Sequence, residues 1–281
     1  GPNMLELLLA LDVQPVGYAD HAAFHQGDYD NPAEQIPYLG DRITTQPINV
    51  GLDYSPSTEA LLRANPNLIL VTENNNPQYE MLSNIAPTLV LQWDAVETNL
   101  RAIAQAVERT DQAEQQLKQM ETQIAATRQA LATVVASYPE IALLSSVEAQ
   151  QFNLVTDRNS ICGKRVQELG FQLVYPPGME AATLNNPTIP LSLETLSQLN
   201  EADSIVLLGF NFAPEQSAPN FSEGQLKQVQ QAWQENAIAQ SLPASKNERV
   251  YFIPAYLCFG LPGPIGTELY LKALKEQLLA L

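Results

Sequence analysis

The chain has 281 residues, of which 45% are hydrophobic, so it can bury one large core or two of ordinary size. Its 31 acidic residues against 14 basic ones give a formal net charge of −17. This charge argues against nucleic acid as a partner, because phosphate neutralisation needs clustered Lys and Arg, and it favours a well-dispersed monomer.

The first predicted elements, a helix end followed by a short strand, occur twice. Residues 6–17 read ELLLALDVQPVG and residues 165–175 read RVQELGFQLVY. Superposition pairs Asp12 with Gly170. Both residue types suit the position just past a helix C-terminus, where the chain turns toward a strand.

A second pair of similar segments follows in the same order. Residues 57–71 read STEALLRANPNLILV and residues 192–207 read SLETLSQLNEADSIVL. Each begins with a Ser that can cap a helix, has a Glu near the positive end of the helix dipole, and ends in an apolar strand. Apolar strands alternating with helices predict parallel sheets covered on both faces. The two repeated pairs therefore predict two related α/β lobes.

Residues 97–137 contain no Gly and no Pro and are rich in good helix formers, with apolar residues at helical spacing. They predict a single long helix between the lobes, ended by Tyr138-Pro139. We expect an N-terminal lobe over 1–111, an inter-lobe long helix over 112–137 and a C-terminal lobe over 138–281. Within the second lobe we expect, in chain order, a strand over 141–145, a helix over 223–240, a strand over 249–253 and a loop with a closing amphipathic helix over 262–281.

Signatures of enzymes are missing from the sequence: it has no GxGxxG, no GxxxxGK[ST] and no GxSxG. The two cysteines, Cys162 and Cys258, form neither a disulfide framework nor a CxxC site, and we expect unpaired buried thiols. The two histidines, His21 and His25, lack a third ligand nearby and are expected to be loop residues rather than a zinc site. No run of about 18 apolar residues predicts a membrane span, and any export signal is expected upstream of Gly1.

Ligands of parallel α/β lobes bind outside the carboxyl ends of the strands. The segments expected there are rich in aromatic, amide and acidic residues, a mixture suited to a roomy polar-aromatic pocket. They are residues 1–3, 18–24, 51–55, 72–76, 146–152, 209–212 and 255–260.

The order and spacing of these segments resemble the ferric-siderophore and cobalamin class of periplasmic substrate-binding proteins of ABC importers. The resemblance covers essentially the whole chain, through YLGDR, IAPTLVL, NSICGKRVQELGF, NERVYFIPAYL and GPIGTELYLKALKEQL in addition to the segments above. It implies two Rossmann-like lobes with parallel sheets, joined by one long backbone helix, with the ligand cleft between the lobes. The opening strand of the family would precede Gly1, so we take residues 1–3 as the first cleft loop, and Cys258 stands where the family often has Trp.

The resemblance implies a binding protein that is not an enzyme and has no cofactor, located in the periplasm or lipid-anchored at the cell envelope. Its ligand would be a ferric siderophore, whose own atoms coordinate the iron while the protein supplies aromatic walls and polar contacts. The candidate ligand-binding residues are His21, Arg42, Asp53, Tyr54, Glu73, Phe152, Arg158, Asn159 and Tyr256.

The resemblance also implies that a glutamate of each lobe docks against arginines of the membrane permease, which works with an ATPase. The matching residues are Glu59 and Glu194. The alternative is that each carboxylate only complements its helix dipole, which is worth about 0.3–1 kcal/mol.

Few cations can be placed near the cleft: Arg42, Arg158 and either Lys164 or Arg165. The acids Asp53 and Glu73 would oppose an anion, which favours a hydroxamate or citrate-hydroxamate siderophore over a tris-catecholate. Cobalamin and haem are alternatives within the family. A chelatase-like enzyme, the rival from another class, would need His21 with Asp20, and a metallochaperone or zinc receptor would need three or more convergent ligands, which the sequence does not supply.

Overall fold

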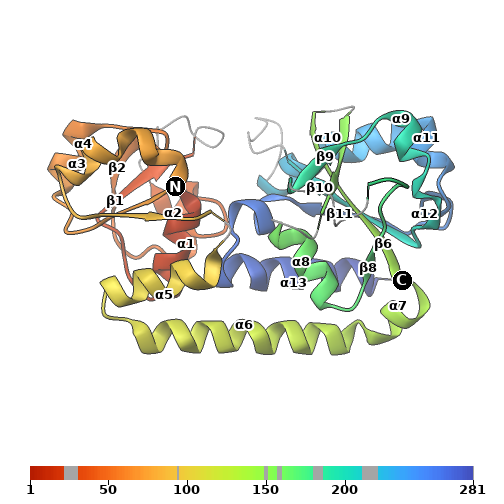
Figure 1. Ribbon diagram of the computed structural model, residues 1–281, viewed down its shortest axis with the longest axis horizontal. Coiled ribbons are helices and arrows are strands. Elements are labelled where there is room, and N and C mark those ends of the chain that lie inside the picture. The colour runs from red at the N-terminus through yellow and green to blue at the C-terminus, as the bar shows by residue number, and fades with distance from the viewer. Residues whose placement is uncertain are drawn as a thin grey trace. The chain divides into compact units, whose positions relative to one another are not determined.

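The computed structural model describes residues 1–21, 31–93, 95–148, 151–156, 160–179, 186–210 and 221–280. The chain forms two compact units: unit 1 comprises Gly1–Gln119 with Leu261–Ile265, and unit 2 comprises Met120–Gly260 with Gly266–Leu281. In Figure 1 the red-to-yellow part of the ribbon belongs largely to unit 1 and the green-to-blue part largely to unit 2. Both units mix helices with parallel strands, as predicted.

Unit 1 is built from short helices around parallel strands. Its elements are α1 (Pro2–Ala10), β1 (Gly17–Asp20), α2 (Pro32–Gln35), η1 (Gly40–Arg42), β2 (Ile48–Leu52), β3 (Ser55–Pro56), α3 (Thr58–Ala64), β4 (Ile69–Thr72), η2 (Glu73–Gln78), α4 (Tyr79–Ser83), β5 (Thr88–Leu91) and α5 (Val96–Ala106). β1 pairs with β2 and β4 with β5, both in parallel, while β3 forms a short antiparallel pair with β2. α3 packs against β2, and their apolar side chains join a core that includes Val50, Leu61 and Ile69.

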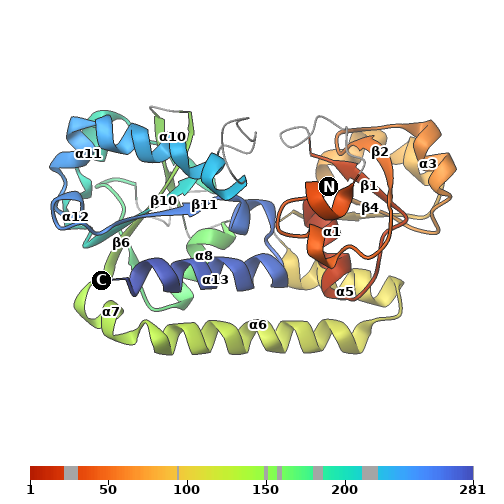
Figure 2. The same cartoon turned by 180° about the vertical axis from the view of Figure 1, so that it is seen from behind.

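Unit 2 is built around one larger sheet. Its elements are α7 (Ala132–Ser137), β6 (Glu140–Glu148), β7 (Gln151–Val155), α8 (Ile161–Glu168), β8 (Gln172–Leu173), β9 (Thr188–Pro190), α9 (Leu193–Leu196), η4 (Leu199–Glu201), β10 (Ser204–Gly209), α10 (Phe221–Glu235), α11 (Ala237–Ser241), α12 (Pro243–Lys246), β11 (Val250–Pro254), η5 (Tyr256–Gly260) and α13 (Pro264–Leu278). The sheet runs in the order β11-β10-β6-β7-β9, with β8 beside β6. β10 is buried at every residue, as expected for a parallel strand covered on both faces. α10 packs against β10 and β11, and Figure 2 shows these elements from behind.

The sheet of unit 2 is not wholly parallel, which the sequence did not predict. β6, β10 and β11 are parallel, but β7 returns antiparallel to β6, and β9 is antiparallel to β7. Residues 146–152 read SVEAQQF, a polar stretch that is typical of a loop, whereas β6 extends into it as far as Glu148 and β7 begins at Gln151. A short polar stretch of this kind has little hydrophobic periodicity to mark the strands in it.

The repeated segments occupy equivalent local structures in the two units. α1 ends at Ala10 and α8 at Glu168, and two residues beyond each helix the chain takes a positive φ, 56° at Asp12 and 103° at Gly170. The predicted serine caps are present as well. Ser57 Oγ accepts a hydrogen bond from the Ala60 amide at 3.2 Å, and Ser192 Oγ accepts one from the Thr195 amide at 3.1 Å.

The single helix predicted over 97–137 is divided into three, and the long helix expected over 112–137 corresponds to the 21-residue helix α6. α5 ends at Ala106, α6 (Thr110–Ala130) follows, and α7 begins after Leu131. At the first break Glu108 takes φ 57° and the Arg109 amide donates to the Ala104 carbonyl at 2.7 Å, which is the geometry of a Schellman end. Glycine usually fills that position, so a glutamate there gives no warning in the sequence. The division between the two units falls within α6, after Gln119.

The helix predicted over 223–240 also divides. α10 ends at Glu235 and α11 begins at Ala237, because Asn236 Oδ1 accepts from the amides of Ile238 and Ala239, each at 3.0 Å. An internal asparagine cap of this kind starts a new helix.

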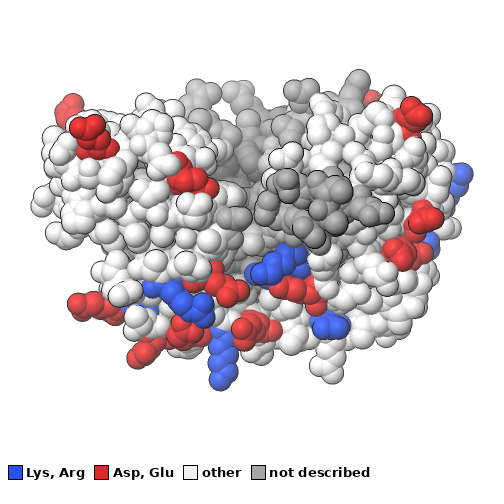
Figure 3. Space-filling view, viewed as in Figure 1, with Lys and Arg blue, Asp and Glu red and all other residues white. Residues whose placement is uncertain are grey.

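The surface carries both signs of charge. In Figure 3 most Lys and Arg side chains in view lie along the lower edge, where acidic side chains surround them. One ion pair joins α5 and α6: Arg101 Nε lies 2.7 Å from Glu114 Oε1. Among the described residues, no helix is long and apolar enough to cross a membrane.

Candidate ligand-binding site

Unit 1 places its polar and aromatic candidates where its parallel strands end. His21 follows β1, Asp53 and Tyr54 follow β2, Glu73 follows β4, and Trp93 lies two residues after β5. These five residues are called the strand-end cluster below. Because paired parallel strands end at the same edge of a sheet, the cluster forms where a ligand of this fold class is expected.

Asp53 organises the cluster through nearly all of its polar atoms. Its Oδ2 accepts from Nδ1 of His21 at 3.0 Å, and its Oδ1 accepts from the amide of Tyr54 at 3.0 Å. Its backbone amide donates to the carbonyl of Asp20 at 2.9 Å, and its own carbonyl accepts from Nδ2 of Asn75 at 2.6 Å. His21 therefore hydrogen-bonds to the carboxylate of Asp53, a residue that the chelatase-like alternative did not invoke.

Two aromatic side chains of the cluster are open to solvent. Tyr54 is 52% exposed and Trp93 is 36% exposed. Burial of part of its ring, and then the neighbouring carboxylate of Asp53, raises the pKa of Tyr54, so its phenol stays protonated beyond the ordinary tyrosine range. Trp93 is held by Glu73, whose Oε2 accepts from the Trp93 amide at 2.9 Å.

Trp93 was not among the residues selected from the sequence. The signal that could have found it is an aromatic residue two positions after the apolar strand in IAPTLVLQW. Of the other predicted ligand residues, Arg42 lies exposed at the end of η1, where its carbonyl accepts from Nε2 of Gln14 at 3.0 Å. Arg158 and Asn159 lie outside the described residues, as does His25.

The two aromatic candidates of unit 2 are core residues, which corrects their predicted role. Phe152 is 3% exposed and packs edge-on against Trp233, with 5.2 Å between ring centroids. Tyr256 is 1% exposed in η5, and its amide donates to Oε1 of Gln225 at 3.2 Å. Their apolar rings add to the hydrophobic core, which explains why residues chosen as cleft walls are found inside.

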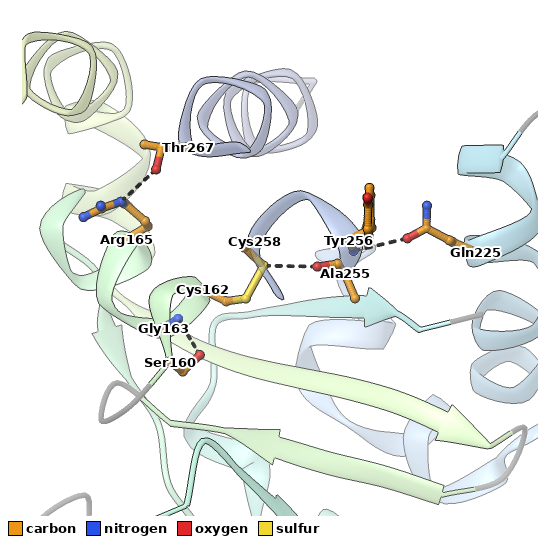
Figure 4. The surroundings of a disulfide bond; sticks show 9 residues. All are labelled: Ser160, Cys162, Gly163, Arg165, Gln225, Ala255, Tyr256, Cys258 and Thr267. Carbon is orange, nitrogen blue, oxygen red and sulfur yellow. Dashed lines mark hydrogen bonds between the residues drawn. A yellow bond between two sulfur atoms is a disulfide. The ribbon is translucent and has the colours of Figure 1, made fainter. Parts of the chain in front are cut away.

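The expectation of two unpaired thiols is also wrong. Cys162, in the first turn of α8, and Cys258, in η5 after β11, form a disulfide with their Cα atoms 5.2 Å apart. Figure 4 shows the bond joining these two segments, with Ser160 capping α8 on one side and the Ala255 carbonyl oxygen 3.6 Å from the Cys258 sulfur on the other. The partners are 96 residues apart, so the sequence spacing alone gave no sign of the pairing.

Arg165 is not available to a ligand either. Its side chain is buried in unit 2, where Nη1 lies 2.5 Å from Oε2 of Glu168 and Nε donates to Oγ1 of Thr267 at 3.4 Å (Figure 4 shows the latter). A buried guanidinium needs its carboxylate partner, because a buried charge left unpaired is costly. Lys164, its neighbour, is exposed.

The two glutamates predicted to dock a permease occupy matching positions. Glu59 lies in the first turn of α3 and Glu194 in the first turn of α9, each two residues after its capping serine. Both are exposed. Within the described residues, no group of three or more His, Cys, Asp or Glu side chains could hold a metal ion.

Comparison with known proteins places the chain among binding proteins. In sequence it is 27% identical over 206 residues to the ferric enterobactin-binding periplasmic protein FepB of Escherichia coli O6:H1, a match of 70% of this chain but only 59% of that protein. In structure it resembles Staphylococcus aureus SirA complexed with staphyloferrin B, with a TM-score of 0.74 and 20% identity, over 99% of this chain and 90% of SirA.

A second similar structure is the siderophore-binding protein FhuD of Vibrio cholerae bound to Fe3+-Desferal, with a TM-score of 0.73 and 18% identity, over 99% of this chain and 95% of FhuD. At these identities the structural likeness concerns the fold. A family model described as periplasmic binding protein matches residues 1–257, most of the sequence. The chain therefore belongs to the periplasmic binding protein family.

Proposed function

We propose that this protein is the substrate-binding component of an ABC importer, and that it binds a ferric siderophore and delivers it to a membrane permease and its ATPase. The observation that carries the proposal is the strand-end cluster, which gathers a histidine, two acids and two exposed aromatic rings in a member of a binding-protein family. The named relatives, FepB, SirA and FhuD, support a siderophore as the ligand class.

The protein would hold the complex without coordinating its iron. A siderophore supplies the iron ligands itself, and the cluster offers ring faces and hydrogen-bonding groups, which suit the outside of such a complex. Tyr54 stays neutral to high pH because its pKa is raised, so it can donate a hydrogen bond to a siderophore oxygen.

The charge near the cluster supports a hydroxamate or citrate-hydroxamate siderophore. Asp53 and Glu73 are both acids, and Arg165, one of the few cations considered for the site, is committed to Glu168. A strongly anionic complex needs several free cations around it, because burying unpaired charge is costly. The relatives do not decide between ligand types, since FeuA of Bacillus subtilis is described as a triscatecholate siderophore-binding protein.

Delivery would use Glu59 and Glu194. An exposed carboxylate at the same place in each unit can form a charge-assisted pair with a permease arginine. We place the working protein in the periplasm or lipid-anchored at the cell envelope. The Cys162–Cys258 disulfide supports this location, because disulfides persist in oxidising compartments outside the cytoplasm.

Fluorescence titration tests the proposed ligand. Ferric siderophores absorb near-ultraviolet emission, so binding beside Trp93 should quench the protein's fluorescence, with a ferric hydroxamate giving stronger binding than a ferric tris-catecholate. Tyr54→Ala should weaken binding by about tenfold, since aromatic contacts often dominate a binding site. The matched control is Tyr79→Ala, an exposed tyrosine of α4 that does not follow a strand. Equal affinity of wild type for iron-free and iron-loaded siderophore would contradict the proposal.

A further inference from the structure

The segment Glu73–Gln78, which forms η2, reaches the loops of two other strands through its side chains. Glu73 Oε2 accepts from the amide of Trp93 at 2.9 Å, in the loop after β5. Asn75 Nδ2 donates to the carbonyl of Asp53 at 2.6 Å, and Gln78 Nε2 donates to the carbonyl of Tyr54 at 3.2 Å, both in the turn after β2. η2 therefore binds the backbone of both loops that carry the exposed rings.

The acids of the cluster are already engaged in bonds within unit 1. Both carboxylate oxygens of Asp53 accept hydrogen bonds, from His21 and from the Tyr54 amide, and Oε2 of Glu73 accepts from the Trp93 amide. Two large aromatic side chains at these loops stay open to solvent: Tyr54 is 52% exposed and Trp93 is 36% exposed. Large exposed rings with an ordered backbone beneath them are typical of a contact surface, because little side-chain entropy is lost on binding.

We propose that η2 is a positioning segment that presents Tyr54 and Trp93 as the ligand-contacting surface of unit 1. Trp93 is then a binding residue additional to those identified from the sequence. Glu73 acts through Trp93 by holding its backbone, and this positioning needs an acceptor oxygen at residue 73 rather than a charge. The identity of the ligand rests on the proposed function, whereas the positioning role can be measured without any ligand.

The positioning role is tested by the accessibility of Trp93 to acrylamide, a neutral quencher that is insensitive to the protein's charge. The chain has two tryptophans, and Trp233 is only 2% exposed, so the quenching reports mainly on Trp93. Glu73→Ala should raise the quenching constant, because the loop loses its hydrogen bond. Glu73→Gln, which keeps an acceptor oxygen but no charge, should behave as wild type. The control Glu80→Ala removes an exposed carboxylate of α4 and should change nothing.

Affinity for a ferric hydroxamate siderophore, measured by calorimetry on the same variants, gives the second readout. Trp93→Ala and Glu73→Ala should each weaken binding by about five- to tenfold, as expected for one lost contact or hydrogen bond, with Glu73→Gln within about twofold of wild type. Equal losses in Glu73→Ala and Glu73→Gln would show that Glu73 acts by its charge and would overturn the proposal. An unchanged quenching constant in Glu73→Ala would also overturn it. If wild type binds no ferric siderophore, the proposed function fails, and the quenching comparison still decides the role of Glu73.

Discussion

Replacing Cys162 and Cys258 together by alanine is expected to destabilise unit 2 by about 3–5 kcal/mol. The bond closes a loop between residues 96 apart, and the loss of chain entropy on closing a loop of that size corresponds to about 4.7 kcal/mol at 25 °C. Native disulfides give about 2–5 kcal/mol in practice, because the unfolded chain keeps some structure. Both cysteines are almost fully buried, at 0% and 2% exposure, so a reductant reaches them only when unit 2 opens.

Urea unfolding of the double variant measures this effect. Trp233 lies in the core of unit 2, and a Trp93→Phe background makes its emission the sole tryptophan signal. The midpoint of the Trp233 transition should fall, while unit 1, which contains neither cysteine, should unfold as before. Thiol labelling of the denatured wild type should find no free thiol. Two free thiols, with a double variant within about 1 kcal/mol of wild type, would mean that the cysteines are unpaired, as expected from the sequence, and that the bond does not stabilise unit 2.

Three further results are expected. Changing Glu59 and Glu194 together to Ala should leave siderophore affinity within about threefold of wild type, since surface changes away from a site typically alter the free energy by about 0.5 kcal/mol or less. The same double change should strongly reduce siderophore uptake in cells, because each carboxylate would lose its pair with a permease arginine. Normal uptake would mean that both glutamates only complement their helix dipoles. Burial raises the pKa of the Tyr270 phenol. The unfolded chain therefore ionises at this tyrosine first, so the contribution of Tyr270 to the free energy of unfolding is complete below about pH 10 and is lost as the pH rises toward the folded-state pKa. Tyr270→Phe should therefore flatten the loss of stability above about pH 10 in thermal melts, and an identical alkaline slope would contradict this. Gly209→Ala should destabilise unit 2 by about 3 kcal/mol or more, because the new Cβ would lie 2.3 Å from the backbone oxygen of Gln225 in α10. A melting temperature equal to that of wild type would contradict this and show that α10 can move aside.

Local rules in the sequence predicted much of the fold. The serine caps at Ser57 and Ser192 and the left-handed turns at Asp12 and Gly170 are confirmed, because each depends on a few neighbouring residues. The break at Glu108 could not be predicted, since the chain there ends a helix without the glycine that normally signals it.

The candidate site was predictable only in part, for a different reason. His21, Asp53, Tyr54 and Glu73 could be selected because a residue after an apolar strand must lie at the sheet edge. Phe152 and Tyr256 also lie near strand ends, but whether an aromatic ring turns to the core or to solvent depends on packing partners such as Trp233, which come from distant parts of the chain. The disulfide is a tertiary contact of the same kind.

The central claim, that this chain binds a ferric siderophore, is tested most directly by native mass spectrometry of the protein incubated with an equimolar panel. The panel contains a ferric hydroxamate, a ferric citrate-hydroxamate, a ferric tris-catecholate, haem and cobalamin. We expect a one-to-one complex with a ferric hydroxamate or citrate-hydroxamate siderophore, lost when the iron is removed and weakened in the Trp93→Ala variant. A complex with haem or cobalamin in place of every siderophore, or no complex at all, would contradict it.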